Sequence, residues 1–191
     1  MRLWRELQHI RPVDLQKNFF ELFNLPVSFQ IDLDLLAERY RAIQSSVHPD
    51  RYVNADKREL RLSLQYATLA NEAAETLRSP LKRAIYLLQL NGIDVAREDY
   101  SGPMEDDFLL LQIGMREELQ NVAEQEDPVA LRKFRAEVNE ITLSLEKDFV
   151  GRIEEKGETN LIKAETSVRK MQFMHKLKQE ADRIEERFLD L

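Results

Sequence analysis

The residues of this chain that could take part in chemistry are concentrated in one tripeptide, His48-Pro49-Asp50, within the stretch SSVHPDRYV. Pro49 fixes its own φ and pushes His48 into an extended conformation, so an imidazole and a carboxylate are held on a stiff turn. Such a tripeptide can also simply end one helix and cap the next. Catalysis is the poorest interpretation, because His9 and His175 are distant in sequence and no Ser or Cys nucleophile pairs naturally with them.

A second candidate site is a group of apolar side chains on the helix expected at 105–123. At about 100° per residue, its core stripe consists of Phe108, Leu111, Met115, Leu119 and Val122. A different sector, roughly opposite, holds Leu109, Leu110, Ile113 and Glu117. Apolar side chains in that sector form either an exposed patch that binds a partner or a surface covered by the N-terminal domain.

Phe173 is a similar exception in the last helix. The coiled-coil-like seam of that helix is formed by Met174, Leu177, Ala181, Ile184, Phe188 and Leu191. Phe173 lies off this seam, at an outer or flanking position, where an aromatic side chain makes a good interface anchor. The alternative is that it packs against a neighbouring helix or domain.

Two amphipathic helices must position the tripeptide. The apolar stripe of the first consists of Leu33, Leu36, Tyr40, Ile43 and Val47. Asp32 is its expected N-cap, and Pro49 ends it. A second stripe at helical spacing runs from Leu60 to Leu77. The pattern predicts an antiparallel helical hairpin that carries the tripeptide at its tip.

The rest of the chain is also predicted to be helical. The segment LKRAIYLLQL predicts a short helix that ends at Asn91-Gly92, and the sequence SGP at 101–103 marks the expected domain boundary. Beyond it, helices are predicted at roughly 105–123, 128–156 and 160–190, which suffice for a three-helix bundle. The predicted fold class is therefore all-α.

Composition excludes several classes of protein. The 191 residues carry a formal net charge of −7 without a basic stripe, which argues against nucleic-acid binding. No cysteine is present, so disulfides and thiolate metal sites are excluded, and no motif indicates a cofactor or metal. No apolar run reaches the ~20 residues that span a bilayer, and the N-terminal stretch lacks the apolar core of a secretory signal. We expect a cytosolic protein.

Four stretches together resemble the HscB family of J-domain co-chaperones: FFELFNLP, YRAIQSSVHPDRY, LANEAAETLRSPLKRAIYLLQLNGID and VRKMQFMHKL. The tripeptide alone would indicate only a J-domain, whereas LRSPLKRAIYLL and the C-terminal bundle make the resemblance specific. It extends from about residue 16 to the C-terminus. The implied domains are an N-terminal extension at 1–15, a J-domain at 16–93, a linker at 94–104 and a scaffold-binding bundle at 105–191.

The resemblance implies that the J-domain binds a DnaK-type chaperone, called HscA in bacteria, and promotes ATP hydrolysis in the active site of that partner. The chain would then not be an enzyme itself. The residues implied in this contact are His48, Pro49, Asp50, Arg39, Arg41 and Arg51. Because these arginines make only a thin basic face, we expect modest electrostatic help to the encounter.

The resemblance also implies that the bundle binds the iron–sulfur scaffold protein IscU. By position, the scaffold-binding residues fall on Leu109, Leu110, Ile113, Glu117 and Phe173. A further acidic position of the family corresponds to Gly114 here. This glycine either removes a carboxylate from the interface or allows close approach of the backbone.

The implied function is delivery of IscU to HscA during iron–sulfur cluster assembly and transfer, in the bacterial cytoplasm rather than the mitochondrial matrix. The alternatives are a J-domain co-chaperone for a different client and a helical binding module without chaperone coupling. A cofactor-free enzyme is the remaining class.

Overall fold

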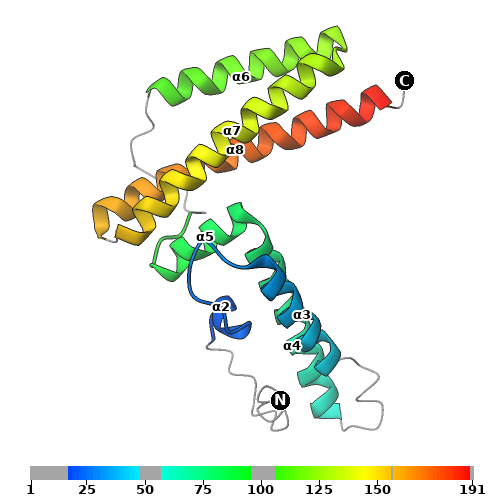
Figure 1. Ribbon diagram of the computed structural model, residues 1–191, viewed down its shortest axis with the longest axis vertical. Helices are drawn as coiled ribbons and strands as arrows, with labels where there is room; N and C mark the ends of the chain where they lie inside the picture. Colours follow the sequence, from blue (N-terminus) through cyan, green and yellow to red (C-terminus); the bar gives the residue numbers. More distant parts are fainter. Residues whose placement is uncertain (1–16, 48–56, 96–105, 156, 190–191) are drawn as a thin grey trace. The chain divides into compact units, whose positions relative to one another are not determined.

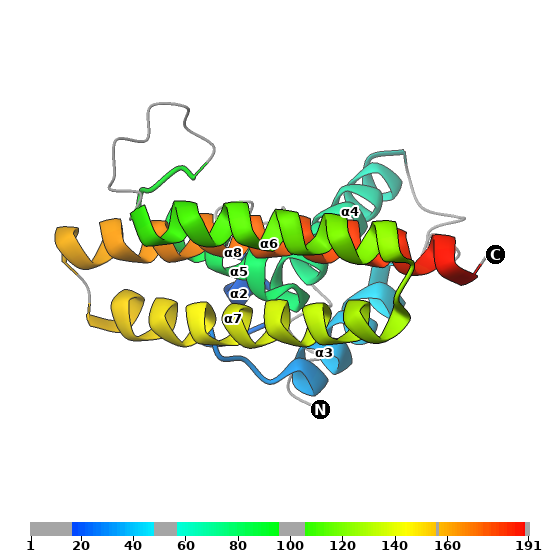
Figure 2. The ribbon, with the colours of Figure 1, turned by 90° about the horizontal axis from the view of Figure 1, so that it is seen from above.

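The computed structural model describes residues 17–47, 57–95, 106–155 and 157–189, and every regular element in these ranges is an α-helix (Figures 1 and 2). The helices are α2 (Phe19–Leu22), α3 (Leu33–Val47), α4 (Lys57–Arg78), α5 (Pro80–Leu90), α6 (Asp106–Gln125), α7 (Pro128–Glu155) and α8 (Glu158–Leu189). The all-α prediction is confirmed, and the three bundle helices begin and end close to their predicted bounds.

The chain divides into two compact units, 1–83 and 84–191, so the division falls inside α5. The sequence predicts a J-domain that ends at residue 93 and a linker at 94–104. Where the functional domains end stays a prediction, and the two units are described separately below.

Helices α2 and α3 begin with side-chain caps. Asn18 and Glu21 form a capping box, in which each side chain accepts a 3.0 Å hydrogen bond from the backbone N–H of the other residue. Asp32 accepts a hydrogen bond of 2.9 Å from the N–H of Leu35. The predicted N-cap of α3 is therefore confirmed.

Helices α3 and α4 pack against each other as the predicted hairpin (Figure 1). Leu36, Ile43 and Val47 are the buried residues of α3. The buried side chains of α4 are Ser63, Ala70, Ala73, Ala74 and Leu77. Because most of these are small, the two helix axes can approach closely. The Asn71 side chain joins the helices by accepting hydrogen bonds from Tyr40 and Gln44.

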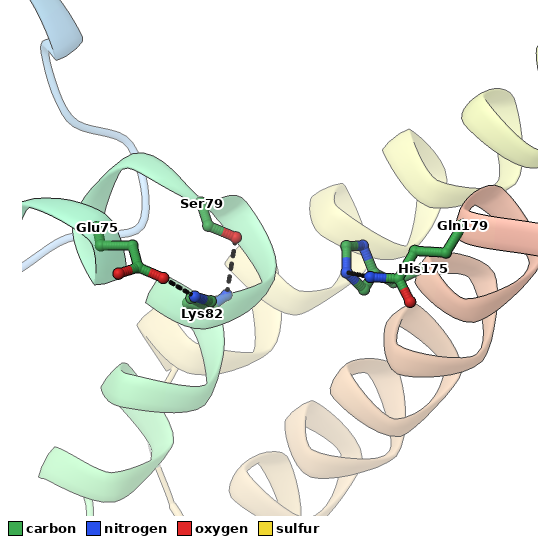
Figure 3. Close-up of polar contacts among 5 residues, drawn as sticks. All are labelled: Glu75, Ser79, Lys82, His175 and Gln179. Atoms are coloured by element: carbon green, nitrogen blue, oxygen red, sulfur yellow. Dashed lines mark hydrogen bonds and ion pairs between the residues drawn. The ribbon is translucent and has the colours of Figure 1, made fainter. Parts of the chain in front are cut away.

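The corner between α4 and α5 is held by two polar contacts (Figure 3). Ser79 caps α5 by accepting a 3.3 Å hydrogen bond from the N–H of Lys82, and Pro80 occupies the first helical position, where no N–H is needed. The Lys82 ammonium forms an ion pair with Glu75 of α4. The Lys82 ammonium also donates a hydrogen bond to the Glu75 carboxylate, and this bond, together with the positive charge, lowers the pKa of the Glu75 carboxyl.

Helix α5 ends at the predicted Asn91-Gly92 pair. Gly92 has a φ of +81°, a conformation that glycine adopts without strain. The N–H of Gly92 donates to the carbonyl of Gln89, and the N–H of Ile93 donates to the carbonyl of Leu88, each at 3.0 Å. These two bonds form a Schellman motif, so the predicted C-cap is confirmed.

Helices α6, α7 and α8 form the predicted three-helix bundle, and they lie side by side in both views (Figures 1 and 2). Asp127 caps α7 by accepting hydrogen bonds from the N–H groups of Val129 and Ala130. The buried core of the bundle consists of Phe108, Met115, Leu119, Val122, Leu131, Phe134, Val138, Phe173, Met174, Leu177, Ala181 and Ile184.

Within the described ranges, no helix is both long enough and apolar enough to cross a membrane. The same part of the chain contains no group of three or more His, Asp or Glu side chains that could hold a metal ion.

Candidate functional site

The tripeptide His48-Pro49-Asp50 and the following Arg51 lie outside the described residues. Helix α3 ends at Val47, and the next described helix begins at Lys57. The tripeptide therefore belongs to the segment between the two helices of the hairpin. Its predicted contact with a chaperone stays a prediction.

Arg39 of α3, which the basic-face prediction includes, makes contacts within the N-terminal unit. Its guanidinium is half-buried and donates to the backbone carbonyls of Phe23, at 2.6 Å, and Asn24. Carbonyls at a helix end lack intrahelical partners and attract a cation. This side chain therefore holds the end of α2 against α3, and its predicted contact with a chaperone stays a prediction.

Arg41 is exposed, as the basic-face prediction expects. Further basic side chains, which the basic-face prediction does not include, lie at the start of α4, where Lys57, Arg58 and Arg61 are all exposed. The N-terminal end of a helix disfavours positive charge, so these residues do not serve the dipole of α4. That mismatch between charge and helix position is the signal that could have found them.

The apolar patch of α6 is exposed. The exposed fractions of Leu109, Leu110 and Ile113 are 43%, 68% and 56%, and Glu117 is exposed beside them. The opposite face of α6 is buried in the bundle core through Phe108, Met115, Leu119 and Val122. The helix therefore carries apolar side chains on two faces, of which the bundle uses one. We call Leu109, Leu110 and Ile113 the α6 patch.

Gly114 lies next to this patch on the exposed side of α6. A Cβ atom built at Gly114 would meet no atom within 4 Å. Packing inside the chain therefore does not require glycine at this position. If Gly114 serves to allow close approach of another backbone, that backbone must belong to a partner.

Phe173 is buried, with an exposed fraction of 8%. Its ring meets the ring of Phe108 edge-on, with 5.8 Å between centroids and an interplanar angle of 83°. The guanidinium of Arg116 lies 5.4 Å from the Phe173 centroid, and the ammonium of Lys170 lies 5.1 Å from the Phe108 centroid. Of the two alternatives for Phe173, packing against a neighbouring helix is what the structure shows, and its predicted role in scaffold binding stays a prediction.

The reason lies in the third helix. A position that would face solvent in a two-helix seam faces α6 here, because α6 packs on α8 as well as on α7. Phe173 therefore supports α6 from inside the bundle through Phe108, one residue before the patch.

His175 is an exposed residue of α8 and lies next to Gln179 of the same helix, at 3.2 Å (Figure 3). This contact occupies a single turn of one helix. It provides no base–nucleophile pair of the kind that general-base catalysis uses.

A helical hairpin followed by a bundle with an unused apolar face defines a class: an all-α protein that acts by binding other proteins. The comparisons with known proteins specify this class further. Residues 104–182 match the family model described as the HSCB C-terminal oligomerisation domain.

Relatives match nearly the whole chain. The chain is 37% identical over 171 residues to the "Co-chaperone protein HscB homolog" of Shewanella woodyi, covering 88% of this chain and 97% of the relative. It is 36% identical over 176 residues to the protein of that name from Vibrio cholerae, covering 90% of this chain and 99% of the relative.

Solved structures agree with these relatives. Chaperone HscB from Vibrio cholerae superposes with a TM-score of 0.77 at 36% identity, covering 90% of this chain and 99% of that one. The crystal structure of human co-chaperone HscB gives a TM-score of 0.82 at 27% identity, covering 95% of this chain and 87% of that one. The chain belongs to the HscB co-chaperone family, whose members are not enzymes.

Proposed function

We propose that this protein couples an HscA-type chaperone to the scaffold protein IscU during iron–sulfur cluster assembly, in the bacterial cytoplasm. Membership of the HscB family supports this proposal. The structural observation that carries it is the α6 patch, whose three large apolar side chains remain exposed although the other face of the same helix is buried.

The tripeptide would act on the chaperone and not on a substrate of its own. A proline-stiffened turn loses little conformational freedom on docking, so His48 and Asp50 can contact the chaperone at low entropic cost. Contact that is tighter in the hydrolysis-competent state of the chaperone shifts its equilibrium toward that state. Hydrolysis itself takes place in the chaperone.

The α6 patch would hold IscU chiefly through apolar burial. Covering a half-exposed leucine or isoleucine contributes on the order of 1 kcal/mol, so three such residues support a moderate affinity. Glu117, on the same face, can orient a basic group of the partner. The exposed Arg41 and the basic start of α4 would assist the encounter with an acidic chaperone surface.

The first test is the ATPase rate of HscA measured with this protein, with and without IscU. We expect the protein to raise the rate, IscU to raise it further, and Asp50→Asn to abolish the stimulation in a protein whose circular dichroism is unchanged. Equal stimulation by Asp50→Asn would disprove the chaperone contact. Stimulation that IscU leaves unchanged would favour a different client.

The second test replaces Leu109, Leu110 and Ile113 by alanine together. These side chains are exposed, so we expect the variant to remain folded and to bind IscU at least tenfold more weakly by calorimetry. The matched control is Leu143→Ala, which removes a leucine of α7 with an exposed fraction of 56%. Unchanged IscU affinity in the triple variant would count against the α6 patch, and the protein would then be a helical binding module for another client.

A further inference from the structure

A groove of about 390 Å³ lies between α6 and α8, and no function proposed above uses it. The buried side chains of Leu119 and Ile184 and the half-buried Ala123 line it. Arg116 of α6 and Glu180 and Arg183 of α8 line it as well, and all three are exposed. The groove thus combines an apolar floor with charged groups that can reach a bound segment.

Two guanidinium groups that can accept a ligand carboxylate border the groove. Two bundle arginines pair with carboxylates: Arg135 with Asp182, at 2.7 Å, and with Glu185, and Arg169 with Glu165, at 2.8 Å. Arg116 and Arg183 form no ion pair with a carboxylate in the described part of the chain. The two arginines outnumber Glu180, the one carboxylate of the lining, so in a protein with 35 acidic and 28 basic residues this groove is locally basic and fits an acidic ligand.

Arg116 connects this groove to the α6 patch. Its guanidinium lies over the ring of Phe173, which packs against Phe108, the residue that precedes Leu109. Further along α6, Gln120 also lines the groove, and it lies in the angular sector between Leu109 and Ile113. A ligand that covers the patch can therefore continue into the groove without leaving α6.

We propose that the α6–α8 groove is a second part of the scaffold-binding surface and accepts an apolar segment that carries an acidic side chain, which Arg116 and Arg183 bind. This inference rests on the proposed function, because the occupant is the partner of the α6 patch. It assigns to that partner a specific chemistry: a carboxylate beside apolar residues, one or two helical turns beyond its contact with Leu110.

Calorimetric titration of IscU into the full chain tests the assignment. We expect Arg116→Gln and Arg183→Gln each to weaken binding by about fivefold, because each removes one partly desolvated charge pair. Arg183→Lys should recover part of the loss, since it restores the charge without the planar fork. The loss should shrink at high salt, where charge pairs are screened.

The control is Arg132→Gln. Arg132 is exposed on α7, opposite Phe134, so this variant makes the same charge change away from the groove and should bind like the wild type. Wild-type affinity in Arg183→Gln, together with lost affinity in Leu110→Ala, would overturn the groove assignment and leave the proposed function standing. Wild-type affinity in Leu110→Ala would contradict the proposed function itself.

Self-association is the competing use of the groove. Sedimentation velocity of the wild type and of Arg183→Gln decides it. A wild-type dimer that Arg183→Gln dissociates, at unchanged IscU affinity, would assign the groove to a second copy of the chain and overturn the proposal.

Discussion

Single residues in this chain carry roles that their side-chain types do not reveal. Phe173 is an aromatic residue at a position that the family resemblance assigns to scaffold binding, yet it is buried against Phe108. Arg39 belongs by position to a basic face, yet it binds the carbonyls at the end of α2. Both residues can affect partner binding by holding an element in place instead of touching the partner.

Phe173 gives a prediction at this scale. Phe173→Ala should lower the free energy of unfolding by about 3 kcal/mol, because it leaves a cavity between α6 and α8. Phe173→Leu keeps most of the volume and should cost only about 1 kcal/mol. Urea unfolding measures both values. In the folded Phe173→Leu variant we expect IscU affinity close to that of the wild type.

Leu110→Ala provides the contrast, since Leu110 is 68% exposed and its loss should weaken IscU binding with little change in stability. If Phe173→Leu were as stable as the wild type but bound IscU as poorly as Leu110→Ala, Phe173 would be a direct contact, and its supporting role would be refuted.

Helix α6 contributes both to the stability of the bundle and to the proposed binding surface. One face supplies buried residues to the bundle, and the other carries the α6 patch. Because the two faces share one helix, substitutions in the buried face can move the patch, whereas substitutions in the patch leave the bundle intact. At Gly114, substitutions allow the effect on helix stability to be measured separately from the effect on partner binding.

Gly114→Ala should raise the free energy of unfolding by roughly 0.5–1 kcal/mol, because alanine restricts the unfolded chain and its Cβ meets no atom within 4 Å. Gly151→Ala is the matched control, since Gly151 lies inside α7 and also has no atom within 4 Å of a built Cβ. Chemical denaturation should show similar gains for both variants.

IscU binding by these two variants and by Gly114→Glu separates the interpretations of Gly114. Weaker IscU binding in Gly114→Ala alone would mean that the partner backbone approaches closely there. Tighter binding in Gly114→Glu would instead mean that the missing carboxylate matters. A loss of stability in Gly114→Ala would contradict the open environment around this residue.

The whole molecule divides inside a helix and not inside a loop. Ala84, Leu87 and Leu88 are buried residues of α5, and they fall within the C-terminal unit. The N-terminal half of α5 is tied to α4 by the contact between Glu75 and Lys82. Helix α5 is therefore continuous between the two units.

Two fragments test this division. A fragment of residues 80–191 keeps α5, whereas a fragment of residues 94–191 lacks it. We expect the shorter fragment to melt at least about 5 °C lower, because it lacks the buried residues of α5 that fall within the C-terminal unit. Thermal unfolding followed by circular dichroism measures the difference. Equal melting temperatures would show that the bundle ends where the sequence predicts it, beyond residue 93.

The sequence alone was sufficient for the helices, for several of their ends and for the sector of α6 that carries the patch, whereas the structure decided that this sector is exposed. Asp32 and the Asn91-Gly92 pair end helices through bonds to residues a few positions away, so their chemistry is visible in a short stretch of sequence. The angular separation of Leu110 from Met115 is likewise a property of one helix, and it correctly placed one side chain outside and the other inside.

The tertiary structure alone decided the surroundings of Phe173, Arg39 and Arg116. Phe173 is buried because a third helix covers it, and Arg39 finds its acceptors 15 and 16 residues earlier in the chain. Arg116 borders a groove that exists only where α6 and α8 meet. Helical periodicity describes one helix at a time, whereas each of these environments arises from the packing of segments that are distant in sequence.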